Sequence, residues 1–209
     1  MITTTTLGPR CLGCASLAAL LLAVTSVALA QPRPGAAASR VRLSVAIASR
    51  DGAPIVSDGW LAERVAIANR IYAPCGIEFV IGETPELDAA HADLVTRSDR
   101  HALGRELRNG VANVFVVRSL RDVDGDGFRQ GVHWRPAGHP GAHFVIISAE
   151  SGPSTLAHEL GHFFGNGHSA TRGNVMSYDR GNVEPFFDAA QRRRIAQFLA
   201  RFLRTQELR

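Results

Sequence analysis

Alternation of apolar and polar positions predicts the first strand of this chain. Over residues 41–49 every second residue is apolar, which is the period of a half-buried β-strand. The apolar positions are Val41, Leu43, Val45 and Ile47. Residues 76–81 (GIEFVI) predict a second strand. Residues 111–117 and 143–148 are almost continuously apolar, which favours interior strands covered on both faces, and the short GVHW segment at 131–134 is expected to form an edge strand.

Apolar residues at helical spacing predict helices between and after these strands. Residues 58–72 carry such a stripe, and Asp58 is positioned to cap the helix. A short helix is expected around 100–108, another begins near residue 153 or 154, and an amphipathic one covers 188–204. The apolar face of this last helix contains Ile195, Phe198, Leu199 and Phe202. The order of elements predicts an α+β domain with a mixed twisted sheet.

Composition narrows this picture to one globular domain, assigned to residues 41–209. Of the 209 residues, 45% are apolar and 20% are charged, which excludes a disordered or fibrous chain. All basic residues are arginines, and the net charge of +4 is spread along the chain. Because no segment clusters basic and aromatic residues, nucleic-acid binding is not expected.

The N-terminal segment is typical of an export signal. Arg10 precedes an apolar run over residues 17–29, and Ala28 and Ala30 form a small-residue cleavage site. We therefore expect residues 1–30 to be a signal peptide, which places the mature protein outside the cytoplasm, secreted or periplasmic, without a stable membrane anchor. An uncleaved anchor is the alternative.

The residues after the predicted cleavage site change the expectations for cysteine chemistry. Residues 31–40 are rich in Pro, Gly and Ala and predict an N-terminal tether. Cys11 and Cys14 would be removed with the signal peptide, which leaves Cys75 as a lone thiol. A buried structural thiol is the favoured interpretation of this residue.

The sequence HELGHFFGNGH, residues 158–168, carries the strongest chemical signal. His158 and His162 are four residues apart, so one helix face would present both imidazoles to a single ion. Gly165 can adopt the positive φ of a sharp turn that returns His168 as a third ligand. Three imidazoles leave one coordination position open, as in a catalytic zinc site, and the adjacent Glu159 is the expected general base.

This motif, followed by NVMSY at residues 174–178, resembles the zinc helix and Met-turn of the metzincins. The spacing of Ser169, Gly173 and Met176 is similar to that of the matrixin branch. The resemblance implies a metzincin-like (zincin) domain and a monomeric zinc endopeptidase that acts on peptide or protein substrates. It also implies that Met176 lies beneath the zinc without binding it. Tyr178 departs from the matrixins and is similar to astacins and serralysins, which implies a fifth ligand or an oxyanion donor; simple packing is the alternative.

Two weaker patterns suggest further metals. Asp122, Asp124 and Asp126 alternate before Gly127 as in an EF-hand calcium loop, although the twelfth position is a histidine. A plain Asp-Gly turn is the alternative. His133 and His143 resemble two ligands of the structural zinc of matrixins. Surface or partly packed histidines without a metal are the alternative.

Two other functions are consistent with a zinc site. One is a catalytically silent zinc-binding module for adhesion or interaction, and the other is a hydrolase of amides in cell-wall peptide. Retention of Glu159 beside the histidines favours catalysis over the silent module.

Overall fold

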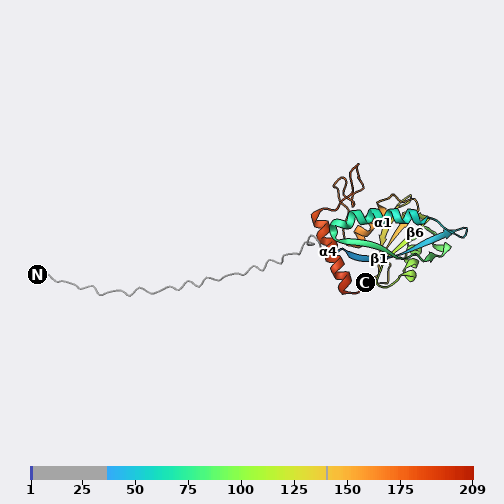
Figure 1. Cartoon of the computed structure of the whole chain (residues 1–209), viewed down its shortest axis with the longest axis horizontal. Helices are drawn as coiled ribbons and strands as arrows, with labels where there is room; N and C mark the ends of the chain where they lie inside the picture. The colour runs from blue at the N-terminus through green and yellow to red at the C-terminus, as the bar shows by residue number, and fades with distance from the viewer. Residues whose placement is uncertain (2–36, 140) are drawn as a thin grey trace. The chain divides into compact units, whose positions relative to one another are not determined.

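The computed structural model describes residues 1, 37–139 and 141–209 (Figure 1). The predicted signal peptide, and the tether up to residue 36, lie outside the described residues. Ser39 and Arg40, expected at the end of the tether, already form the start of the first strand. The tether thus ends earlier than predicted, because both residues pair with residues 77 and 78 of a neighbouring strand.

A mixed seven-stranded sheet forms the centre of the domain, and β8 lies at its edge. Strands β1, β6 and β9 run parallel in this order, and β8 pairs antiparallel with β9. Strands β3 and β4 run parallel to β1, whereas β2 is antiparallel to its end. The strands are β1 (Ser39–Arg50), β2 (Ala53–Pro54), β3 (Ile77–Glu83), β4 (Glu86–Leu87), β6 (Ala112–Val117), β8 (Gly131–Trp134) and β9 (Phe144–Ser148); a separate parallel pair consists of β5 (Asp93–Leu94) and β7 (Ser119–Leu120). The prediction of an α+β fold with a mixed sheet is confirmed.

Four α-helices accompany the sheet, and none of the described helices is long and apolar enough to cross a membrane. They are α1 (Asp58–Tyr72), α2 (Arg97–Ala102), α3 (Thr155–Phe163) and α4 (Ala189–Arg204), with 3₁₀ turns at Ala73–Cys75, Ala89–His91 and Leu103–Glu106. Helix α1 has its predicted bounds, but Ser57 rather than Asp58 caps it by accepting a hydrogen bond from the Trp60 N–H. A serine hydroxyl one residue earlier reaches the free N–H groups of the first turn equally well.

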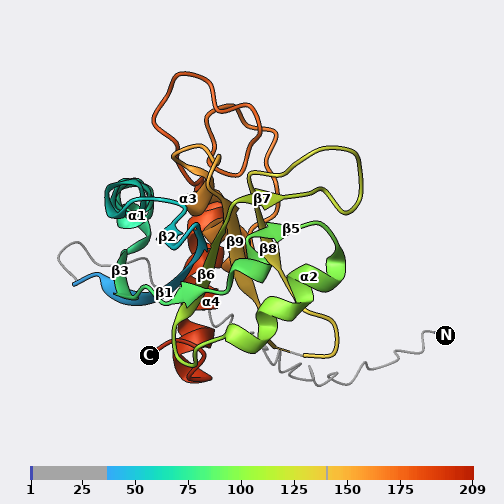
Figure 2. The same cartoon turned by 90° about the vertical axis from the view of Figure 1, so that its right-hand side faces the viewer.

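Apolar clusters cover both faces of the sheet, and Figure 2 shows α1 and α2 on opposite sides of it. Val41, Leu43, Val45 and Ile47 of β1 share one buried face, as predicted, and this face belongs to the cluster that contains residues of α1, α3 and α4. Ala46 and Ala48 of the same strand are buried in the opposite cluster, with residues of β5, β7 and the 3₁₀ turn after α2. The strand expected to be half-buried is therefore covered on both faces over residues 43–48.

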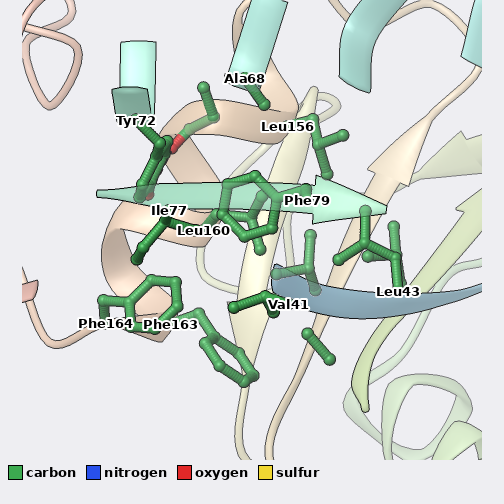
Figure 3. Packing of buried hydrophobic residues seen from close by; sticks show 14 of the residues in the cluster. Val41, Leu43, Ala68, Tyr72, Ile77, Phe79, Leu156, Leu160, Phe163 and Phe164 are labelled. Carbon is green, nitrogen blue, oxygen red and sulfur yellow. Dashed lines mark hydrogen bonds between the residues drawn. The ribbon is translucent and has the colours of Figure 1, made fainter. Parts of the chain in front are cut away.

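Helix α3 packs against the sheet and α1 through apolar side chains, which are distinct from its chemically active residues. Leu156 and Leu160 of α3 pack among side chains of β1, β3 and α1 (Figure 3). The Tyr72 hydroxyl donates a hydrogen bond to the Ala157 carbonyl oxygen at 3.2 Å. Burial of these apolar side chains holds α3 next to β8, so the two elements form opposite sides of one cleft.

The thiol of Cys75 is buried in the core that α1, α3 and α4 share. Burial raises the pKa of this thiol to about 12. The neutral thiol is therefore the stable form at neutral pH, as expected for a structural cysteine.

Candidate metal centre

Helix α3 presents His158 and His162 on one face, with ring centroids 4.8 Å apart. Both fall on the helix turn that faces β8 and the cleft. The four-residue spacing places the two histidines one above the other on the helix, as predicted from the sequence.

The chain turns sharply after α3 and returns a third histidine. Gly165 has φ +81°, and a Cβ at this position would lie 2.4 Å from the Phe198 ring of α4. Glycine is therefore required by both conformation and space. After this turn, His168 Nε2 lies 3.1 Å from His162 Nε2. One ring nitrogen from each of the three histidines lies within 4.8 Å of the others.

Backbone carbonyls fix which nitrogens of the helical histidines are free. His158 Nδ1 lies 2.7 Å from the Val175 carbonyl oxygen, and His162 Nδ1 lies 2.8 Å from that of Asn166. A carbonyl oxygen only accepts hydrogen bonds, so each Nδ1 carries a proton and each Nε2 keeps its lone pair. Burial also lowers the pKa of His158 to about 4 and lowers that of His162, which favours the neutral rings that a metal requires.

The three residues fit a zinc ion. Two Nε2 atoms 3.1 Å apart bring lone pairs together, and a cation between them would relieve the repulsion. Imidazole donors suit zinc and related transition metals rather than calcium or magnesium, which prefer oxygen. Within the residues that the structure describes, this is the group of three or more His, Cys, Asp or Glu side chains that converges as a metal site.

Glu159 lines the same cleft and packs against the edge strand. The residue is almost fully buried, at 5% exposure. Burial raises the pKa of this carboxyl to about 8, against the lowering effects of the His133 backbone and of Arg180. A Cβ on Gly131 would lie 2.8 Å from the Glu159 Cγ, so this glycine of β8 makes room for the acid.

Met176 lies in a tight turn and packs directly beneath α3. The residue is fully buried, and its backbone N–H donates to the Asn174 side-chain oxygen at 2.8 Å. A Cβ on Gly161 of α3 would lie 2.2 Å from the Met176 sulfur. The sequence analysis did not assign Gly161 or Gly131 a function, although glycine inside a helix or a strand is itself a signal of close packing.

Tyr178 lies at the mouth of the site, beside the third histidine. It is 72% exposed, and its hydroxyl lies 3.0 Å from His168 Nε2. The residue therefore reaches the metal centre instead of packing in the core.

A cleft of about 1180 Å³ is lined by the three histidines, Glu159 and Tyr178. Helix α3 lies along one side of the cleft, and the β8 residues Gly131, Val132 and His133 lie along the other. Tyr178 lies at the rim. Four arginines also line it: Arg129, Arg135, Arg180 and Arg194.

His133 and His143 come together, but not as a converging metal site. His133 Nε2 lies 2.7 Å from His143 Nδ1, while His143 Nε2 contacts the Glu207 carboxylate from the C-terminal segment. Because both nitrogens of His143 are engaged, the three groups form a line. Burial lowers the pKa of His133 to about 2 and of His143 to about 3, so neutral rings are favoured. The structure thus does not support the predicted second zinc, and Glu207 is a partner that the sequence analysis missed.

The predicted calcium loop is also held by other contacts. Asp122 pairs with Arg129 at 2.9 Å, and Asp124 pairs with Arg97. Asp126 is exposed and does not join these two in a converging group. The loop lies between the bridged residues Arg121 and Phe128, which corresponds to the alternative of an Asp-Gly turn.

Comparison with known proteins relates this fold to metallopeptidases. No protein-family model matches the chain, and no curated protein matches its sequence. Archaemetzincin from Methanopyrus kandleri superposes with a TM-score of 0.54 at 18% identity, over 80% of this chain and 99% of that one. A promirolysin mutant from Tannerella forsythia gives 0.58 at 13% identity, over 82% and 83%. Metalloproteinase-II from Bacteroides fragilis gives 0.55 at 16% identity, over 79% and 55%. At these identities the likeness shows the fold, and the fold is metzincin-like.

Proposed function

We propose that this chain is a zinc-dependent endopeptidase with Glu159 as its general base. The observation that carries the proposal is the position of Glu159, buried in the cleft beside three converging imidazoles and packed against β8. The metzincin-like fold supports the same reaction class, because the neighbours that share it are named as metalloproteinases or zincins.

His158, His162 and His168 would hold the zinc. When bound, zinc supplies Lewis acidity, which polarises a carbonyl oxygen and makes water acidic near neutral pH. Glu159 takes a proton from the water that attacks the scissile carbonyl carbon while the new C–O bond forms. The same carboxyl then donates a proton to the amide nitrogen as the C–N bond breaks. Tyr178, whose hydroxyl lies 3.0 Å from His168 Nε2, would donate its hydroxyl hydrogen to the developing oxyanion, a role similar to that of the tyrosine of astacins.

The substrate in this proposal is a peptide bound in extended form along β8. This strand is the last one in the sheet order of the described residues, and three of its residues line the cleft. A peptide backbone can add to such an edge as a further strand. We also propose that residues 1–30 are a signal peptide, that residues 41–209 form the enzyme domain of the matrixin-like type, and that the protein acts as a monomer outside the cytoplasm.

Substitution of Glu159 by Gln tests the mechanism. The protein expressed from its full sequence, zinc-loaded, is incubated with casein and with cell-wall material, with and without chelator. We expect casein cleavage that chelator abolishes and that Glu159→Gln lowers by roughly 10²–10⁴-fold, since a general base contributes about that much. Glu150→Gln, an exposed residue, is the matched control and keeps full activity.

Other outcomes would separate the alternatives. Equal activity in Glu159→Gln and wild type would contradict the proposed base. Cleavage of cell-wall peptide without casein would favour the amide hydrolase. A folded, zinc-loaded protein that cleaves neither substrate would favour the silent zinc-binding module.

A further inference from the structure

Arg180 is held rigidly in the cleft by two hydrogen bonds. Its Nε donates to the Ser177 carbonyl oxygen at 2.9 Å, and one Nη donates to the Ser154 hydroxyl at 2.6 Å. The first partner belongs to the turn that contains Met176, and the second precedes α3. The guanidinium is thus fixed between two elements that build the metal centre, and the residue is partly buried.

The neighbouring aspartates do not form an ion pair with this cation. Asp179, the adjacent residue, pairs with Arg172 at 3.6 Å, and Asp122 across the cleft pairs with Arg129. Arg180 forms no ion pair with a carboxylate of the described residues, although many arginines of this domain do. A guanidinium has five N–H groups, so three of those of Arg180 have no bond to a described residue.

A partly desolvated cation that makes no direct ion pair with a described carboxylate favours a ligand that supplies one. Burial is the largest influence on the pKa of Arg180 and lowers it, whereas the nearby Glu159 charge raises this pKa. A carboxylate matches the planar N–H fork of arginine and forms charge-assisted hydrogen bonds with it. The remaining N–H groups therefore present a binding site for an acidic group beside the proposed general base.

The rest of the cleft carries the same sign of charge. Arg129, Arg135 and Arg194 also line it, against Asp122 and Glu159 as the carboxylates of the described lining. Asp122 and Arg129 neutralise each other, which leaves three arginines against Glu159, so the net charge of the cleft lining is positive. A concave surface lined by one sign of charge concentrates ligands of the opposite sign.

We propose that Arg180 binds a carboxylate of the substrate, so that this cleft selects acidic peptides. The proposal rests on the proposed peptidase function and names its substrate class. The carboxylate comes either from an Asp or Glu side chain or from the C-terminal carboxylate of a short peptide; both present the same group to the guanidinium.

Cleavage of matched peptides tests the selection. A series of fluorescent peptides carries Glu or Gln at each position around one cleavage site, with a free or amidated C-terminus. We expect the best acidic peptide to exceed its Gln or amide counterpart by about 10-fold or more in kcat/KM, since hydrogen bonds to charged groups contribute about 1.5–3 kcal/mol. The position of the preferred Glu, or a preference for the free acid alone, identifies the source of the carboxylate.

Variants assign the selection to Arg180. Arg180→Gln is expected to reduce the preference to within about twofold, and Arg180→Glu to shift it toward Lys. Arg193→Gln on the exposed face of α4 removes the same net charge away from the cleft and keeps the preference. If Arg180 were merely a clamp between the turn and α3, Arg180→Gln would slow Glu and Gln peptides equally, and this result would overturn the proposal.

Equilibrium binding separates this proposal from the proposed function. In zinc-loaded Glu159→Gln, the acidic peptide should bind about 10-fold more tightly than its Gln or amide counterpart, and adding Arg180→Gln should remove the difference. An unchanged binding ratio overturns carboxylate recognition by Arg180. Failure of the wild-type enzyme to cleave any peptide counts against the peptidase function, while the binding ratio still decides the role of Arg180.

Discussion

Two groups of histidines lie close together in this domain and use their ring nitrogens differently. In the zinc-site group, backbone carbonyls engage Nδ1 of the two helical histidines, and the Nε2 atoms converge. In the second group, His143 engages His133 with one nitrogen and Glu207 with the other. A metal site therefore depends on which nitrogens the surroundings leave free, rather than on the number of histidines nearby.

The second group stabilises the framework around the first. The His143 ring stacks on Phe163 of α3, with centroids 4.2 Å apart, and Glu207 belongs to the segment after α4. His133 in turn belongs to β8, the strand that packs against Glu159. A line of hydrogen bonds thus connects the C-terminal segment with the strand that positions the proposed base.

Zinc stoichiometry gives the largest expected contrast between the two groups. We expect one zinc per chain in the wild type and in His143→Asn. His168→Ala should lose it, with an affinity loss beyond the roughly 10–100-fold typical of an outer-sphere partner. Metal analysis after dialysis checks this, and two zinc ions per wild-type chain, with one lost in His143→Asn, would contradict the distinction.

Glu207 should matter for stability more than for metal binding. Glu207→Leu leaves the buried Nε2 of His143 without a partner, so we expect a loss of about 1–3 kcal/mol in the free energy of unfolding, with zinc retained. Glu207→Gln keeps an acceptor and should lose less. Urea unfolding of the zinc-loaded proteins measures both, and equal stability of Leu and wild type would show that the contact contributes nothing.

The Asp loop should show the smallest effect of the three. Asp124→Asn removes an exposed ion pair with Arg97, and surface pairs contribute about 0–1 kcal/mol. Addition of calcium should leave the thermal midpoint unchanged in both wild type and variant. A rise in the midpoint with calcium that Asp124→Asn abolishes would restore the calcium site that the arginine contacts argue against.

The spacing of apolar residues predicted the main elements of the fold, because each element buries a local pattern of apolar side chains. The bounds of α1 and the edge position of β8 follow from the sequence. The second face of β1 could not be predicted, since Ala46 and Ala48 are too small to mark burial, and the covering residues come from distant segments. The helix expected around residues 100–108 begins earlier, at Arg97, where Thr96 and Asp99 form a capping box, and it continues after Ala102 as a 3₁₀ turn to Glu106.

The geometry of the metal centre was predictable to the extent that it is helical and local. The four-residue spacing placed His158 and His162, and the positive φ of Gly165 is confirmed. The roles of Gly131 and Gly161 depend on how β8 and the Met176 turn approach α3, which no local pattern specifies.

By itself the sequence determined the elements, the zinc-ligand motif and its acid, because each depends on spacings of a few residues along one helix and one turn. Only the tertiary structure decided which other charged groups remain available. It paired Asp122 and Asp124 with arginines, engaged His143 with Glu207, and left Arg180 in the cleft without a described carboxylate partner. Such pairings join residues far apart in the chain, and they are set by packing of the whole domain rather than by any local preference.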